Sequence, residues 1–336
     1  MLSIWGLPAF DDNYLWIVHN GKDAVAIDPG DAAVVGKALQ EHGLQLRAIL
    51  ATHKHADHTG GITRLLADSA VPVYGSQTDQ IPGLTHPVSD GERITIPELN
   101  LTLEVIAVPG HTLGHVAYYA ASEQALFSGD TLFAGGCGRL FEGSATQMRA
   151  SLNKLAALPA DTRVYCAHEY TLSNLRFAAA AEPDNPQVAA RLQHVQNLRA
   201  EQKPSVPSLL ADELATNPFL RSDQHGIVAT LRRECGLPEH ADADASFAHQ
   251  GNVGISHVRH LGLTGAGVLV TGVSHCVGQA CVADHAAQAL GESRCRRKLV
   301  IKRTLVGLAA ARRAGQTHGL VRAGSLLEGA GQLLHL

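Results

Sequence analysis

The chain has 336 residues, of which 45% are hydrophobic and 17% charged, and its formal net charge is −4. This length allows two domains with a substantial core, and the composition is that of an ordinary soluble protein, not a fibrous or disordered one. We find no run of about 18 apolar residues and no basic segment leading into an apolar one at the N-terminus, so we expect neither a membrane span nor a secretory signal. The six Cys residues form no CxxC pair, which favours a reducing cytoplasm.

The charge is distributed unevenly along the chain. Residues 251–336 contain ten Lys and Arg against three acids, a balance of +7, which leaves 17 basic and 28 acidic residues, a balance of −11, in the first 250. An acidic body is poorly suited to holding the phosphates of nucleic acid. We therefore expect no nucleic-acid partner.

Taken in chain order, the first 165 residues alternate apolar strand-like runs with helical stretches, the pattern of a layered α/β domain. Residues 25–27 read as a strand that ends in the turn 28–30, and a helix is expected from about residue 32 to 41. A second helix is expected from Thr59 onward. From about residue 170 the pattern turns helical, and Asn185 followed by Pro186 predicts the start of a helix that ends near residue 203.

The segment Thr52-His53-Lys54-His55-Ala56-Asp57-His58 stands out because three imidazoles and one carboxylate follow one another within six residues. Imidazole and carboxylate are the ligands that zinc, iron and manganese accept, and crowding four such groups is costly without a cation to satisfy them. Two ligand pairs so close together indicate two metal ions. Lys54, between the ligands, is expected to face away as a solvated charge.

Three further apolar runs end in a residue of the same chemical kind. They are residues 103–110 before His111, residues 125–129 before Asp130, and residues 163–167 before His168. In layered α/β folds, groups that bind or react gather where strands stop and loops begin. The four fragments together therefore predict one metal site. His115 is interpreted as a packing or supporting residue, not as a ligand.

This series resembles the metallo-β-lactamase superfamily, and four local segments narrow the resemblance to its glyoxalase II family, the hydroxyacylglutathione hydrolases. These segments are Pro8–Tyr14, Cys137–Gly143, His168–Phe177 and Asn217–Arg221. The resemblance runs from residue 1 to about 247. It implies an α+β fold, in which an αββα sandwich carries all the ligand loops on one rim and a smaller helical domain follows. The implied domains are a metal-binding catalytic domain (1–165), a helical substrate-binding domain (166–250) and an atypical basic tail (251–336).

The resemblance also implies a role for each site residue. One metal ion would be held by His53, His55 and His111, the other by Asp57, His58 and His168, with Asp130 bridging both. Asp57 and Asp130 would take part in catalysis. The positions that match glutathione contacts in the family are Arg139, Phe141 and Tyr170. The implied cofactors are two divalent metal ions, zinc first, with iron and manganese left open because His and Asp suit all three.

The implied function is a binuclear-metal thioesterase of the cytoplasm that acts as a monomer. It would hydrolyse S-D-lactoylglutathione and related 2-hydroxyacylglutathiones to D-lactate and glutathione in methylglyoxal detoxification. Two alternatives stay open. One is a glutathione persulfide dioxygenase with a single iron, against which segments 137–143 and 168–177 weigh. The other is a catalytically impaired metal-binding protein whose basic tail recruits partners.

The last 86 residues differ from the rest, since they contain no Phe, Tyr, Trp or Pro. Members of the family end shortly after the point matching residue 247 with a helix that carries an Arg-x-x-Lys-Asp pattern, which is missing here. Our hypothesis is a shift of reading frame near residues 247–251 that leaves a disordered tail. The competing interpretation is a genuine basic appendage for an acidic partner. How much glutathione affinity survives without the missing pattern stays open.

Overall fold

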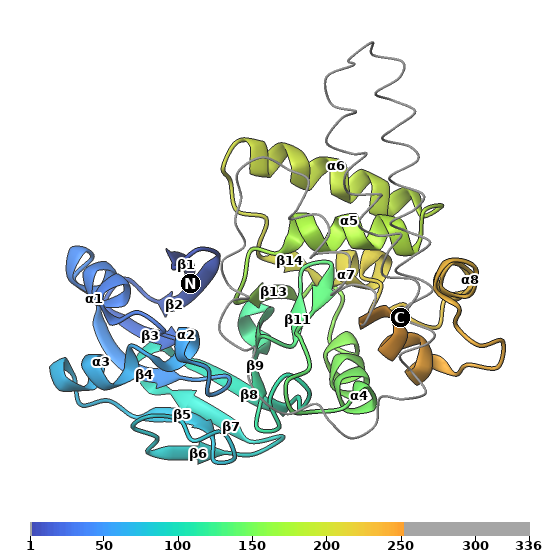
Figure 1. The fold of residues 1–336 in the computed structure, drawn as a ribbon. Helices are drawn as coiled ribbons and strands as arrows, with labels where there is room; N and C mark the ends of the chain where they lie inside the picture. Colours follow the sequence, from blue (N-terminus) through green and yellow to red (C-terminus); the bar gives the residue numbers. More distant parts are fainter. Residues whose placement is uncertain (1, 252–336) are drawn as a thin grey trace, which may run out of the picture. The chain divides into compact units, whose positions relative to one another are not determined.

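The structure is a computed structural model, and it describes residues 2–251 (Figure 1). Apart from Gly251, the basic tail (residues 251–336) lies outside the described residues. The two hypotheses about the tail therefore stay predictions. Residues up to Arg233, and those from Leu237 onward in the described range, belong to one compact unit. The domain boundary placed between residues 165 and 166 stays a prediction.

Two six-stranded sheets form the centre of this unit, and the order of the first is β1-β2-β3-β4-β5-β6. Its strands are β1 Ser3–Ala9, β2 Asn13–His19, β3 Asp23–Ile27, β4 Gln45–Leu50, β5 Val73–Ser76 and β6 His86–Val88. The predicted strand at residues 25–27 is therefore confirmed as part of β3. Strands β3 and β4 run parallel, with Ile27 opposite Leu50, so the loops that follow them leave the sheet at the same edge.

The second sheet has the order β14-β13-β10-β9-β8-β7. Its strands are β7 Arg93–Ile96, β8 Leu101–Ala107, β9 Val116–Ala120, β10 Ala125–Gly129, β13 Arg163–Cys166 and β14 Ser208–Leu209. A separate hairpin pairs β11 Leu132–Phe133 with β12 Gly136–Cys137. Because β8 and β10 are both antiparallel to β9, and β10 is parallel to β13, the strands β8, β10 and β13 end on the same side of the sheet.

The helices are α1 Ala32–Glu41, α2 Ala56–Thr59, α3 Ile62–Asp68, α4 Ala145–Ala156, α5 Thr171–Ala181, α6 Pro186–Ala200, α7 Leu210–Thr216 and α8 His225–Thr230. Short helical turns are η1 Pro97–Leu99, η2 Ala121–Glu123 and η3 Leu231–Cys235. Side chains cap several of the helices: Asp31 accepts from the first turn of α1, Ser144 forms a capping box with Gln147 in α4, and Asn185 caps α6. The predicted bounds of α1 are confirmed, and α6 ends at Ala200, three residues before the predicted stop.

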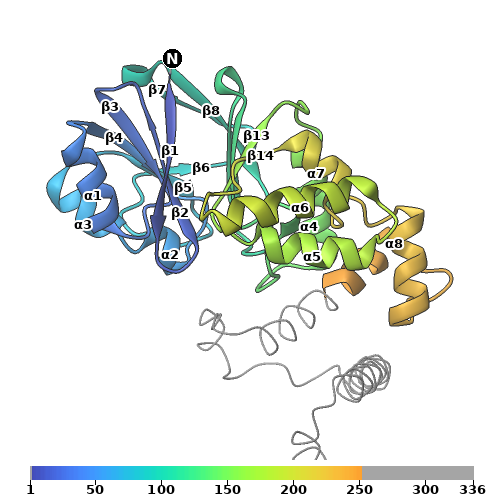
Figure 2. The ribbon, with the colours of Figure 1, turned by 90° about the horizontal axis from the view of Figure 1, so that it is seen from above.

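Helices cover the outer face of each sheet (Figure 2). One buried cluster fills the space between the sheets and includes Leu50 from β4 and Leu103 from β8. A second joins the outer face of the first sheet to α1 and α3, and a third joins the second sheet to α4. This is the expected αββα sandwich, followed by the expected helical region of α5 to α8. The sandwich forms because strands whose two faces are both apolar need a layer on each side.

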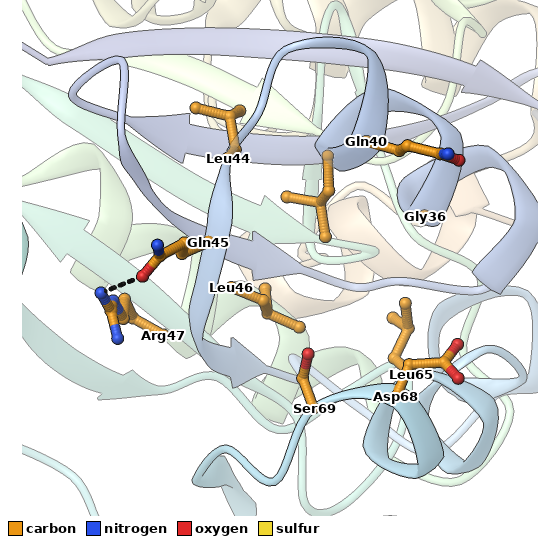
Figure 3. A pocket seen from close by; sticks show the side chains of 10 residues that line it. Gly36, Gln40, Leu44, Gln45, Leu46, Arg47, Leu65, Asp68 and Ser69 are labelled. Atoms are coloured by element: carbon orange, nitrogen blue, oxygen red, sulfur yellow. Dashed lines mark hydrogen bonds between the residues drawn. The ribbon is translucent and has the colours of Figure 1, made fainter.

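A groove of about 480 Å³ lies on the outer side of the first sheet, between α1, the start of β4 and α3 (Figure 3). Leucines line its floor, and polar side chains such as Gln45 and Arg47 lie at its edge, where they are hydrogen-bonded to each other. The polar cluster at residues 52–58 follows the other end of β4. The groove is therefore not part of the predicted metal site.

Candidate metal centre

The structure brings all seven predicted ligands together, from four loops that each follow a strand. His53 and His55 follow β4, and the ligands on the second sheet follow β8, β10 and β13. Asp57 and His58 lie on α2, which begins at Ala56, inside the polar segment. The prediction had placed the start of the helix after this segment, at Thr59. This one-turn helix turns the two side chains back toward those of the preceding loop, which an extended chain could not do.

The ligand atoms form two groups that share one carboxylate. The first group is His53, His55 and His111, and the second is Asp57, His58 and His168; a further combination joins His53, His58 and Asp130. Within each combination the ligand atoms all lie within 4.8 Å of one another. Asp130 places Oδ1 3.4 Å from Nε2 of both His58 and His168, and Oδ2 3.4 Å from Nε2 of His111. The carboxylate of Asp130 therefore lies between the two groups.

Hydrogen bonds on the outer side of the imidazoles fix how the rings present their inner nitrogens. Nδ1 of His58 donates to Asp28 at 3.0 Å, and Nδ1 of His168 donates to Asp12 at 2.8 Å. Nδ1 of His111 donates to the carbonyl of Arg139 at 2.7 Å. Because Nδ1 of each of these rings is occupied by an outer hydrogen bond, Nε2 is the atom that each ring presents to a metal ion.

Burial and charge set the protonation states of the cluster. Burial lowers the pKa of His53 and of His111, which keeps both rings neutral near pH 7. Burial opposes ionisation of Asp130, but the neighbouring His168 and His58 outweigh it and hold the pKa of this carboxyl well below its usual range. Burial likewise opposes protonation of His168, but Asp130 and Asp12 raise its pKa to about 9. A cation in the second group would therefore displace a proton from His168.

The donor set fits a pair of metal ions. Among the described residues, Nε2 of His58 and Oδ1 of Asp130 are buried without any hydrogen-bond partner. Such a buried unpaired polar atom costs about 1–3 kcal/mol. Nδ1 of His55 lies 3.0 Å from Nε2 of both His53 and His111, and the single proton that it can carry cannot serve both contacts. A cation in each group would satisfy the unpaired nitrogens and the unpaired oxygen together.

The three predicted substrate contacts line the two groups from different sides. The Phe141 ring lies 5.4 Å from that of His55 and 5.1 Å from that of His111, and it is half exposed. The guanidinium of Arg139 lies 4.9 Å above this ring. Tyr170 stacks on His168 with their ring centres 4.8 Å apart. An aromatic side chain therefore flanks each metal group.

The expectation about Lys54 was incomplete. Its side chain is partly exposed, as a solvated charge would be, but its Nζ also pairs with Glu142 at 2.5 Å. Glu142 also accepts from the backbone N–H of Leu113 at 2.9 Å, so this pair joins three loops around the site. The carboxylate that pairs with Lys54 lies 88 residues further along the chain, and spacing along the sequence could not reveal it.

Sequence reasoning also missed several residues that support the ligands. Asp79 is fully buried and accepts from the backbone of Lys54 and Gly114 and from the hydroxyl of Thr112, which joins two ligand loops. His115 was expected to support the site, and its Nε2 accepts from the backbone N–H of Asp130 at 3.0 Å. Asp28, which accepts from His58, could have been found from the sequence, because it directly follows a strand end just as the predicted ligands do.

Comparison with known proteins agrees with this geometry. The model of the metallo-beta-lactamase superfamily matches residues 10–168, and the model of the hydroxyacylglutathione hydrolase C-terminus matches residues 169–248. The hydroxyacylglutathione hydrolase of Nitrosomonas eutropha is 52% identical over 236 residues, which cover 70% of this chain and 92% of that protein. That of Dechloromonas aromatica is 52% identical over 250 residues, covering 74% of this chain and 91% of that protein.

Solved structures show the same fold. The crystal structure of the BLEG-1 B3 metallo-beta-lactamase matches with a TM-score of 0.50 and 26% identity, over 66% of this chain and 99% of that one. ETHE1 from Myxococcus xanthus matches with a TM-score of 0.51 and 23% identity, over 76% of this chain and 99% of that one, which bears on the fold alone. By its ligand geometry, its fold and its relatives, the chain belongs to the hydroxyacylglutathione hydrolase (glyoxalase II) family of the metallo-β-lactamase superfamily.

Proposed function

We propose that this protein hydrolyses S-D-lactoylglutathione and related 2-hydroxyacylglutathiones to the free hydroxy acid and glutathione, using two divalent metal ions. The observation that carries the proposal is the pair of ligand groups that share Asp130. The identity of about 50% with proteins named hydroxyacylglutathione hydrolase supports the same proposal. In methylglyoxal detoxification, the acid released would be D-lactate.

In this proposal His53, His55 and His111 would hold the first metal ion, Asp57, His58 and His168 would hold the second, and Asp130 would contribute its carboxylate to both. When bound, two such cations make water available as a nucleophile near neutral pH and polarise the carbonyl under attack. Zinc is the first choice, and the nitrogen and oxygen ligands accept iron or manganese as well. Two cations of any of these metals would serve the same hydrolysis.

The protein's own side chains position the reactants. Oδ2 of Asp57 accepts from Nδ2 of Asn13 at 3.0 Å, which fixes the carboxylate at the mouth of the second group. From there Asp57 can orient the attacking water as well as bind the metal. The leaving group is a thiolate whose parent pKa is about 8.5, so it departs without an obligatory proton donor. This agrees with a site that has carboxylates and imidazoles but needs no separate general acid.

Glutathione carries two carboxylates, and Arg139 offers an exposed guanidinium next to the first metal group. A guanidinium can bind a carboxylate through two parallel hydrogen bonds. Phe141 and Tyr170 supply aromatic surface on either side, although Phe141 has no hydroxyl to donate. Without the Arg-x-x-Lys-Asp segment of the family, we expect a raised KM with the hydrolytic centre retained.

No helix in the described part of the chain is long and apolar enough to cross a membrane. A cytoplasmic location, a monomeric state and the absence of a nucleic-acid partner stay predictions. The acidic balance of the first 250 residues supports the last of these.

The test is steady-state hydrolysis of S-D-lactoylglutathione by the full-length protein loaded with zinc, followed by loss of the thioester absorbance, with metal content measured in the same sample. We expect two metal ions per chain and turnover that Asp130→Asn abolishes. Asp68→Asn, which removes an exposed carboxylate at the end of α3, is the matched control and should leave turnover unchanged. One iron per chain, with oxygen consumption on glutathione persulfide and no thioesterase activity, would instead support the dioxygenase alternative.

A further inference from the structure

The carboxylate of Asp28 touches the support of both metal groups. Asp28 lies directly after β3, is almost completely buried, and has a φ of 51°, a left-handed conformation that non-glycine residues seldom adopt. Its Oδ1 accepts from the backbone N–H of Thr52 at 2.7 Å. Its Oδ2 accepts twice, from Oγ1 of Thr52 at 2.7 Å and from Nδ1 of His58 at 3.0 Å. One oxygen therefore binds a ligand of the second group directly.

The same oxygen reaches the first group through Thr52. Since the hydroxyl of Thr52 gives its only proton to Asp28, its lone pairs must accept any other hydrogen bond. Nδ1 of His53 lies 3.1 Å from this hydroxyl oxygen and is therefore the donor. His53 is fully buried, so this contact is shielded from solvent. The proton on Nδ1 leaves the lone pair of His53 on Nε2, which is the atom that faces the first metal group.

We propose that Asp28 is a positioning residue that sets the ring tautomer of one ligand in each metal group, His58 directly and His53 through Thr52, so that the affinities of both metal positions depend on this one carboxylate. This inference rests on the two-metal centre proposed above. This common dependence follows from chemistry, because an ionised carboxylate can only accept. Both chains of hydrogen bonds must then run toward Asp28, so that Nδ1 of each ring carries the outer proton and Nε2 is the atom left for a metal ion.

Two substitutions separate the direct contact of Asp28 with His58 from its contact with His53 through Thr52. Asp28→Asn keeps the shape of the side chain but can present an N–H where Oδ2 stood. That donor would face Nδ1 of His58 and the hydroxyl of Thr52, and it would favour the opposite tautomer in both histidines. Thr52→Val keeps volume and β-branching but removes the hydroxyl that links Asp28 to His53, while Asp28 still accepts from His58. Loss of an outer hydrogen-bond partner weakens metal binding by about 10–100-fold in other proteins.

The experiment is zinc titration of the metal-free full-length chain against a chelator of known affinity, which yields two dissociation constants. Thr52→Ser keeps the hydroxyl and should leave both constants at the wild-type values. Thr162→Val is the matched control, because the buried Thr162 hydroxyl has no hydrogen-bond partner among the described residues. The ¹⁵N shifts of the His53 ring in the metal-free protein supply a readout independent of metal and of turnover.

We expect Asp28→Asn to weaken both constants by about 10–100-fold and Thr52→Val to weaken one of them by a similar factor. We also expect the proton of His53 to move from Nδ1 to Nε2 in Asp28→Asn. Unchanged constants in Thr52→Val, or a loss confined to one position in Asp28→Asn, would overturn this common dependence on Asp28. If the wild-type chain itself binds fewer than two zinc ions, the two-metal centre fails instead, so the two failures are distinguishable.

Discussion

Replacing Gly30 by Ala tests how closely the ligand loop must pack against the turn after β3. A Cβ added at Gly30 would lie 1.8 Å from the backbone oxygen of Asp57 and 2.4 Å from its carbonyl carbon, whereas real Cβ atoms essentially never come closer than 3.0 Å to such atoms. The obstacle is backbone, not a flexible side chain that could turn away. To lengthen the 1.8 Å contact to the 3.0 Å limit, the turn and α2 must separate by about 1.2 Å.

The size of this shift predicts the effect. Metal–ligand distances tolerate changes of only about 0.2 Å, so a shift several times larger withdraws Asp57 and its neighbour His58 from the second metal group. Misplacing reacting groups by about 1 Å can lower turnover by about 100-fold, and forcing extra volume into a packed region costs about 1–3 kcal/mol. We expect the Gly30→Ala variant to fold, to lose the second of the two proposed metal ions, and to lose at least about 99% of its kcat.

The assay is metal content by mass spectrometry, together with kcat on S-D-lactoylglutathione and urea unfolding. Gly36→Ala is the control, since it lies within α1 and an added Cβ meets nothing within 4 Å. Alanine in a helix is about 0.5–1 kcal/mol more favourable than glycine, so this variant should be slightly more stable and fully active. A Gly30→Ala protein that retains two metal ions and wild-type kcat would refute the reasoning.

Three further predictions follow from the same structure. Asp130→Asn replaces an oxygen that faces Nε2 of ligand histidines, so it should lose at least one metal ion and nearly all turnover; two retained metal ions with full activity would refute the bridging role. Arg139→Gln should raise KM by about 10–150-fold, the range for loss of a charge-assisted hydrogen bond, with metal content unchanged, and an unaltered KM would exclude this contact. Arg221 holds Glu182 through two hydrogen bonds, of 2.8 and 3.1 Å, and although burial opposes it, this pairing lowers the pKa of Glu182. A carboxyl whose pKa is lower in the folded state stabilises the fold at pH values above its ordinary pKa of about 4.5, and this stabilisation is lost as the pH falls. The free energy of unfolding of Arg221→Gln, measured in urea, should therefore be clearly below that of the wild type at pH 7 and closer to it at pH 3.5.

Much of this site could be predicted from local features of the chain. The imidazoles and carboxylates of the ligand set stand directly after apolar runs, and because strand ends gather at one edge of a sheet, their convergence follows from their order in the sequence. The bounds of α1 and the start of α6 were equally accessible, since Asp31 and the Asn185-Pro186 pair are helix-start signals of short range. Residue type and spacing along the chain suffice for features of this kind.

Other features were decided only by tertiary structure. Asp28 is 30 residues from His58, Asp12 is 156 residues from His168, and Lys54 is 88 residues from Glu142. Whether such groups meet at hydrogen-bond distance depends on the angles between strands, the left-handed backbone at Asp28 and the close contact at Gly30. A shift of 1 Å would break any of these contacts without altering a single local pattern. The sequence alone thus determined which residues could bind metal, and the packing of distant segments decided how each of them is held.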